Sequence, residues 1–165
     1  MSKNLNKDKI IVIDFGSQVT KLIARRIREY SVLSEVLTLK DLIKMNEFSN
    51  VKGIILSGGP STVTKGSFPK IPNKIFNLKI PILGICYGLH ALVNYFSGRV
   101  FADSHKEYGK AVLSWNIENS KRCSEVFNEP FTAQTVWMSH GDFVEKIPQN
   151  FLVLAASELK VPAIL

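Results

Sequence analysis

The sequence has few of the features that mark membrane, exported or disulfide-stabilised proteins. None of its apolar runs approaches the roughly 20 residues needed to span a bilayer. Residues 1–9 are polar and have no apolar core of an export signal. Cysteine occurs only at Cys86 and Cys123, so a disulfide framework is not expected. We therefore expect a cytoplasmic protein.

Acidic residues are also few, 14 against 21 lysines and arginines, which gives a net charge of +7. Such an excess would suit nucleic-acid binding. The lysines are scattered, however, and the densest basic set (Arg25, Arg26 and Arg28) falls on the polar side of an expected amphipathic helix. No recognition-helix or RNA-binding motif accompanies it. We expect a solvated basic surface, with neither a nucleic-acid nor a membrane partner, and no metal site.

What is present is an alternation of short apolar runs and amphipathic segments, in a chain of 165 residues that suits one compact domain. Strands are expected at 9–14, 35–39, 53–57 and 81–85, and helices at 19–30, 41–45, 73–78 and 89–96. This alternation predicts an α/β fold with an open, mostly parallel sheet flanked by helices. In the second half, strands are expected at 98–103, 109–115, 132–137 and 151–157. Some of these should form an antiparallel extension.

Residues 84–88, Gly-Ile-Cys-Tyr-Gly, are the most informative segment. They match G-x-C-x-G, the cysteine counterpart of the nucleophile elbow, between an expected strand and an expected helix. In such an elbow the nucleophile has an unusual backbone conformation, and the helix N-terminus lowers the pKa of the Cys86 thiol. The backbone N–H of Tyr87 then faces a developing oxyanion. The alternative is a buried structural cysteine between two ordinary glycines.

Two further segments accompany the elbow. Gly58 and Gly59 follow an expected strand, at the sheet edge where ligands bind in open α/β folds. The N–H of Gly59 is therefore a candidate to complete an oxyanion hole. Residues 139–142, Ser-His-Gly-Asp, are expected in a turn after an apolar strand. His140 is either a base for Cys86 or part of a loop that lines the substrate pocket, and the second interpretation is preferred.

These segments, in this order, resemble the class I (triad-type) glutamine amidotransferases and, within them, the GMP synthase branch. Residues 14–18 (Asp-Phe-Gly-Ser-Gln) and 22–26 (Leu-Ile-Ala-Arg-Arg) carry the same resemblance. It extends from about Ile10 to Ala156. It implies a flavodoxin-like fold, with residues 1–165 forming one glutaminase domain that is incomplete at its C-terminus.

The resemblance also implies a chemistry. Glutamine is hydrolysed to glutamate and ammonia through a thioester on Cys86, and the N–H groups of Gly59 and Tyr87 hold the oxyanion. The substrate-binding residues it implies are Gly58, His90, Ser139, His140, Gly141 and Asp142. The ammonia would serve an ATP-pyrophosphatase synthetase domain or subunit that aminates XMP to GMP, in an enzyme expected to be a homodimer. ATP and magnesium are expected only in that synthetase, and no cofactor is expected here.

Two departures from the family pattern lead to alternatives. His90 stands where the family usually has glutamine, either as a tolerated polar substitution or as a change that alters substrate fit or the stability of the thiolate. The family's base and its carboxylate lie in a Phe-His-Pro-Glu run, and none of His90, His105 and His140 lies in one. We therefore expect little activity from the 165-residue chain alone. The alternatives are a non-catalytic glutamine-binding or regulatory relic, and a different cysteine hydrolase with His140 or His90 as base.

Overall fold

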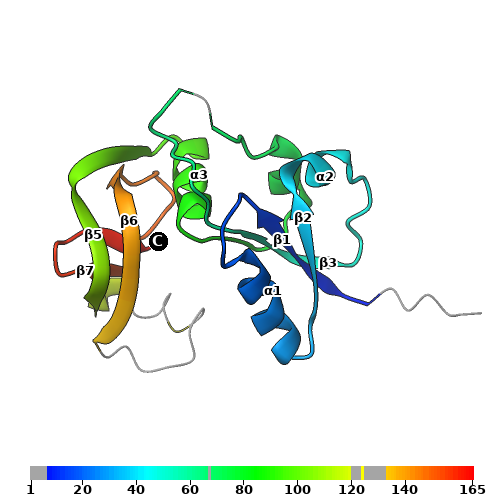
Figure 1. Ribbon diagram of the computed structural model, residues 1–165, viewed down its shortest axis with the longest axis horizontal. Helices are drawn as coiled ribbons and strands as arrows, with labels where there is room; N and C mark the ends of the chain where they lie inside the picture. The colour runs from blue at the N-terminus through cyan, green and yellow to red at the C-terminus, as the bar shows by residue number, and fades with distance from the viewer. Residues whose placement is uncertain (1–6, 67, 120–123, 125–132) are drawn as a thin grey trace, which may run out of the picture. The chain divides into compact units, whose positions relative to one another are not determined.

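The computed structural model describes residues 7–66, 68–119, 124 and 133–165 (Figure 1). The chain divides into two compact units, Met1–Tyr95 and Phe96–Leu165. Each unit is described by itself below. Within the described residues, no helix is both long and apolar enough to cross a membrane.

The first unit is built on a four-stranded parallel sheet. Its strands are β1 (Lys9–Asp14), β2 (Leu33–Thr38), β3 (Val51–Leu56) and β4 (Ile82–Gly84), in the order β2-β1-β3-β4. Because the chain moves from β1 to one side for β2 and to the other side for β3, β1 and β3 form a topological switch point. In open α/β sheets, ligands bind beyond the carboxyl ends of the strands at such a point.

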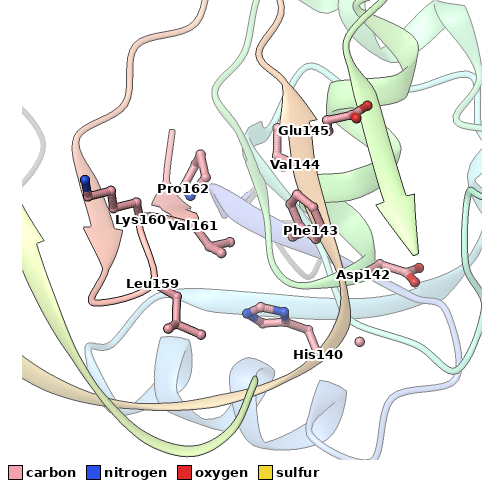
Figure 2. Close-up of a pocket in the computed structure, with 10 residues that line it drawn as sticks. His140, Asp142, Phe143, Val144, Glu145, Leu159, Lys160, Val161 and Pro162 are labelled. Atoms are coloured by element: carbon pink, nitrogen blue, oxygen red, sulfur yellow. The ribbon is translucent and has the colours of Figure 1, made fainter. Parts of the chain in front are cut away.

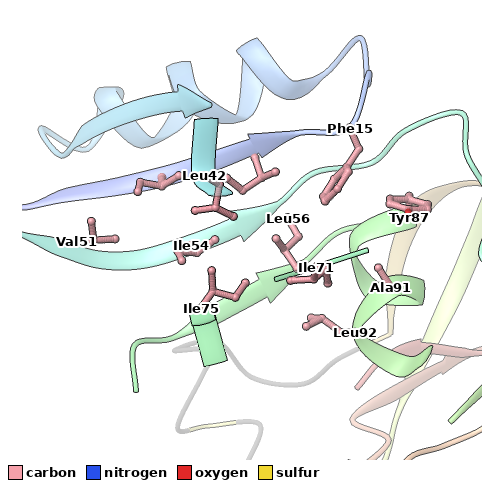
Figure 3. Close-up of a cluster of buried hydrophobic side chains, with 12 residues drawn as sticks. Phe15, Leu42, Val51, Ile54, Leu56, Ile71, Ile75, Tyr87, Ala91 and Leu92 are labelled. Atoms are coloured by element: carbon pink, nitrogen blue, oxygen red, sulfur yellow. The ribbon is translucent and has the colours of Figure 1, made fainter. Parts of the chain in front are cut away.

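Helices cover both faces of this sheet. They are α1 (Thr20–Glu29), α2 (Leu39–Lys44), the 3₁₀ helix η1 (Asn73–Leu78) and α3 (Tyr87–Tyr95). Ile11 and Ile13 of β1 belong to a cluster of buried side chains with Leu42 of α2 and Ile75 of η1. Val12, also fully buried, points to the opposite face because side chains alternate along a strand. Figure 3 shows Leu42 and Ile75 in this cluster, with α1 on the other side of the sheet. The full cluster is Ile11, Ile13, Phe15, Leu42, Val51, Ile54, Leu56, Ile71, Ile75, Tyr87, Ala91 and Leu92. The expected α/β layers are confirmed.

The second unit is an antiparallel sheet in the order β6-β5-β7-β8. Its strands are β5 (Arg99–Trp115), β6 (Gln134–Lys146), β7 (Ala155–Ser157) and β8 (Pro162–Ile164), and the 3₁₀ helix η2 (Ile117–Asn119) follows β5. The expected antiparallel extension is therefore confirmed.

The lengths of β5 and β6 correct two expectations. The strands expected at 98–103 and 109–115 are one strand, and residues 139–142 lie inside β6 rather than in a turn. The reason is the pairing of β5 with β6, which runs from Arg99↔Lys146 to Leu113↔Gln134 with irregularities on the way. This ladder keeps Gly109, with φ +109°, and Gly141 within strands.

Candidate active site

Cys86 occupies the turn between β4 and α3 and is exposed. Its φ of +53° lies in the left-handed region, which costs energy for a residue with a side chain. Two backbone hydrogen bonds hold the turn on either side of the thiol. The N–H of Ile85 donates to the Leu56 carbonyl (2.9 Å), and the N–H of His90 donates to the Cys86 carbonyl (3.1 Å). The geometry is that of a nucleophile elbow.

Glycines on both sides of Cys86 permit this turn. A Cβ at Gly88 would lie 2.2 Å from the Leu56 carbonyl oxygen, and a Cβ at Gly84 would lie 2.6 Å from the backbone nitrogen of Leu89. Only glycine therefore allows α3 to begin directly against β3. The helix starts at Tyr87, two residues earlier than expected, so Cys86 immediately precedes its N-terminus.

The Gly-Gly-Pro turn after β3 lies beside the elbow. A Cβ at Gly58 would be 3.5 Å from the Cβ of Cys86 and 3.6 Å from the Oγ of Ser17. A Cβ at Gly59 would be 2.4 Å from the Phe15 carbonyl oxygen. The turns that follow β1, β3 and β4 therefore meet at the carboxyl edge of the sheet, as the switch point predicts.

The backbone N–H groups of Gly59 and Tyr87 are the two candidate oxyanion donors. Within the part of the chain that the structure describes, neither N–H donates a backbone or side-chain hydrogen bond. The N–H of Gly88, the next along the helix, donates instead to the Ser57 carbonyl (3.1 Å).

A buried hydroxyl lies beneath the Gly-Gly-Pro turn. The Ser57 Oγ, in a residue with no exposed surface, accepts from the Phe15 N–H (3.3 Å) and donates to the Gly58 carbonyl (2.9 Å). It also lies 3.1 Å from the Thr20 hydroxyl oxygen, whose single hydrogen is within reach of the Asp14 carboxylate (2.9 Å to Oδ1). The sequence alone does not single out Ser57 or Thr20. Ser57 is visible there only as the residue before Gly58 and Gly59, at the end of the expected strand 53–57, and Thr20 gives no signal.

The side chain of Tyr87 anchors the elbow from within the core. It is 1% exposed, lies edge-on to the Phe15 ring (5.0 Å between centroids) and donates its hydroxyl hydrogen to the Pro69 carbonyl (2.7 Å). Burial raises the pKa of Tyr87 to about 12, so the phenol stays protonated at neutral pH. Tyr87 therefore links the start of α3 to Phe15, which follows β1, and to Pro69, which precedes η1.

The remaining sequence-predicted residues lie in two places. His90 is buried in α3, one helical turn after Cys86. Ser139, His140, Gly141 and Asp142 lie in β6, in the second unit. Cys123 lies outside the described residues.

A cavity of about 500 Å³ lies within the second unit, between β6 and the turn that joins β7 to β8 (Figure 2). Its lining residues are His140, Gly141, Asp142, Phe143, Val144, Glu145, Leu159, Lys160, Val161 and Pro162. The structure thus brings Gly58, Gly59 and Tyr87 to Cys86, and places three residues of the Ser-His-Gly-Asp segment on this cavity.

The sequence profile of the glutamine amidotransferase class-I family matches residues 11–164. The chain belongs to that family. Among class I glutamine amidotransferases it is 46% identical over 154 residues to "GMP synthase [glutamine-hydrolyzing]" of Campylobacter lari, covering 93% of this chain and 29% of that protein. It is also 46% identical over 161 residues to the enzyme of the same name from Bacillus subtilis, covering 95% and 29%. The chain therefore spans about 29% of the length of these relatives.

Solved structures agree with this membership. A protein of Thermoplasma acidophilum described as part of a GMP synthase superposes with a TM-score of 0.68 at 28% identity, covering 92% of this chain and 74% of that one. A glutamine amidotransferase of Methylobacillus flagellatus gives a TM-score of 0.72 at 17% identity, covering 94% and 64%, and supports the fold alone. The family and the named relatives support a glutaminase-type enzyme.

Proposed function

We propose that the chain is the glutaminase part of a GMP synthase, which hydrolyses glutamine to glutamate and ammonia. One observation carries this proposal beyond family membership: an exposed cysteine in a left-handed elbow, with the Gly58–Gly59 turn against its Cβ. In the non-catalytic alternative, nothing would require the strained backbone at Cys86.

The first half of the reaction forms a thioester. The Cys86 thiolate, favoured by the N-terminus of α3, attacks the carbon of the glutamine side-chain amide. A C–S bond forms, and an electron pair moves onto the amide oxygen. The N–H groups of Gly59 and Tyr87 donate to that oxyanion. Collapse of the intermediate breaks the C–N bond, and the nitrogen leaves as ammonia with a proton that balances the one lost by the Cys86 thiol.

The second half hydrolyses the thioester. Water attacks the same carbon, the C–S bond breaks, and glutamate and the Cys86 thiol are released. We place Gly58 and His90 of the first unit, with Ser139, His140, Gly141 and Asp142 of the second, among the substrate-binding residues. No base is assigned to any described residue.

The ammonia is proposed to pass to an ATP-pyrophosphatase synthetase domain or subunit, which aminates adenylylated XMP to GMP with ATP and magnesium. The relatives from Campylobacter lari and Bacillus subtilis are named "GMP synthase [glutamine-hydrolyzing]", which supports this coupling.

The test is ammonia release from glutamine by the intact protein. Cys86→Ala should lower the rate by at least about a thousandfold, as loss of a nucleophile does. Cys123→Ala is the matched control and should keep the wild-type rate. Ammonia release that persists in Cys86→Ala would contradict the assignment of the nucleophile. Glutamine binding without any ammonia release by the wild type would favour the non-catalytic alternative.

A further inference from the structure

We propose that Ser57 is a positioning residue that fixes the orientation of the peptide between Gly58 and Gly59. This inference rests on the proposed function, because the N–H of that peptide is the proposed oxyanion donor of Gly59. Ser57 has no exposed surface, so its hydroxyl is placed to act through the protein groups that it contacts rather than by touching a substrate.

The orientation follows from one hydrogen bond. The Ser57 hydroxyl donates to the Gly58 carbonyl oxygen at 2.9 Å and so holds that oxygen toward the buried hydroxyl. In a trans peptide the carbonyl oxygen and the following N–H point in opposite directions. The N–H of Gly59 is therefore directed away from Ser57, out of the protein core.

This peptide needs such a restraint because glycines flank it on both sides. Glycine has no Cβ to restrict its backbone, so a peptide between two glycines reorients more easily than others. The close approach of Gly59 to the Phe15 carbonyl fixes where the turn lies, with a built Cβ only 2.4 Å from that oxygen. It does not determine which way the preceding peptide faces.

The hydrogen-bond capacity of Ser57 favours the observed orientation. A serine hydroxyl has one hydrogen to donate and two lone pairs that accept. Here one lone pair accepts from the Phe15 N–H, and the hydrogen goes to the Gly58 carbonyl oxygen. In a reversed peptide the Gly58 carbonyl would turn away from its buried donor, and the Ser57 hydrogen would lose this acceptor. The loss of that buried hydrogen bond disfavours the reversed state.

Ser34 provides a matched control. It is a buried serine of the same unit, and its hydroxyl donates to the Ala24 carbonyl at 2.8 Å and accepts from Arg28. Ser34→Ala therefore removes a buried hydroxyl and a bond to a backbone carbonyl, but at β2 rather than at the Gly-Gly-Pro turn.

The experiment compares two reactions of Cys86 in the intact protein. Glutamine hydrolysis passes through an oxyanion, whereas alkylation by iodoacetamide displaces iodide without one. Ser57→Ala should lower kcat for glutamine by about tenfold or more, because the oxyanion donor is no longer held in place. The KM and the rate of Cys86 alkylation should stay within about twofold. Ser34→Ala should leave all three within about twofold.

A second variant covers the case in which the alanine cavity unfolds the protein. Ser57→Cys fills the same space with a weak hydrogen-bond donor and should lower kcat by about threefold or more. Peptide mapping separates the introduced thiol from Cys86. A wild-type kcat in whichever of these variants folds would overturn the inference, as would an equal fall in kcat and in alkylation. A wild type that hydrolyses no glutamine would instead defeat the proposed function, and the inference with it.

Discussion

At the scale of single residues, Cys86 combines a proposed chemical role with backbone strain. Its left-handed φ of +53° is a conformation that glycine adopts without penalty. We expect the unfolding free energy of Cys86→Gly to be about 1 kcal/mol higher than that of Cys86→Ala, because only the glycine relieves the strain. Urea denaturation of the two variants measures this difference.

Both variants lack the thiol, so the comparison isolates the backbone. Both should also be inactive in ammonia release. Equal stability of the two would show that the left-handed conformation at position 86 stores no strain, and would weaken the elbow interpretation at its geometric basis.

Tyr87 gives a prediction about pH. Its pKa is raised by burial from 10.0 to about 12, so the folded protein holds this proton more tightly than the unfolded chain. The stabilisation is complete below pH 10 and is lost as pH rises from 10 toward 12, because the unfolded state ionises first. The unfolding free energy of Tyr87→Phe should be lower than that of the wild type below pH 10, and this difference should shrink as pH rises from 10 toward 12.

The measurement is the difference in urea-unfolding free energy between wild type and Tyr87→Phe at several pH values. Taking the difference removes the titration of other tyrosines and of lysines. A difference that stays constant from pH 9 to 12 would contradict the raised pKa.

The candidate site was predictable from sequence where its signal was local. Cys86 and Tyr87 lie in one five-residue motif, and Gly58 and Gly59 in another, so short patterns identified them. The Ser57 hydroxyl contacts Thr20 and Phe15, which are 37 and 42 residues away along the chain. No local pattern reports such contacts, because they depend on the parallel pairing of β1 with β3.

At the scale of secondary-structure elements, the contact of α3 with β3 depends on Gly88. A Cβ there would lie 2.2 Å from the Leu56 carbonyl oxygen, at the carboxyl end of the interior strand β3. We expect Gly88→Ala to lower the unfolding free energy by at least about 2 kcal/mol, since backbone must shift to admit the methyl group. Urea or thermal denaturation measures it.

Gly66→Ala is the matched control for this substitution. A Cβ at Gly66 meets nothing within 4 Å. That variant should have wild-type stability or a gain of about 0.5 kcal/mol from the lower entropy of the unfolded chain. Similar losses in both variants would contradict the packing argument.

The short helix α2 depends on its N-terminal cap. Thr38 and Asp41 form a capping box, in which the Thr38 hydroxyl accepts from the Asp41 N–H (3.2 Å) and the Asp41 carboxylate accepts from the Thr38 N–H (3.0 Å). Thr38→Ala should lower the unfolding free energy by about 1 kcal/mol at neutral pH.

The cap also has a pH dependence. Hydrogen bonds from the Thr38 side chain and backbone lower the pKa of Asp41 below its ordinary value of 3.8. The carboxylate stabilises the folded state fully above that ordinary value and less as pH falls through the lowered one. The deficit of Thr38→Ala should therefore shrink below pH 3.8. A deficit that is unchanged in acid would exclude the carboxylate from the cap.

Element positions were predictable to different degrees in the two units. The run at 9–14 is nearly all apolar, as expected for a strand buried on both faces, and it forms β1 as predicted. In the second unit, Gly109 and several residues of the Ser-His-Gly-Asp segment are of types common in turns. They lie in strands because β5 and β6 pair along their length. This ladder joins residues far apart in sequence, and a local pattern does not contain it.

At the scale of the whole molecule, the two units differ in how much apolar surface they bury. The first unit has the 12-residue cluster that includes Ile11, Ile54 and Tyr87. Among the described residues of the second unit, the buried apolar side chains are Val100, Leu113, Val144, Pro148, Leu154 and Ala155. Because burial of apolar surface is the main stabilising term, the second unit should open at a lower free energy than the first.

Hydrogen exchange in the intact protein tests this difference. Amides of β1 and β3 should exchange most slowly, and those of β5 to β8 should exchange faster. Each 1.4 kcal/mol of difference between the opening free energies of the two units corresponds to about a tenfold difference in exchange rate. If the two sheets instead exchange at the same rate through one global opening, the units form a single cooperative structure. In that case Gly88→Ala would accelerate exchange in β5 and β6 as much as in β3. If the units open separately, the substitution would accelerate exchange mainly in the first unit, where the proposed nucleophile and its oxyanion donors lie.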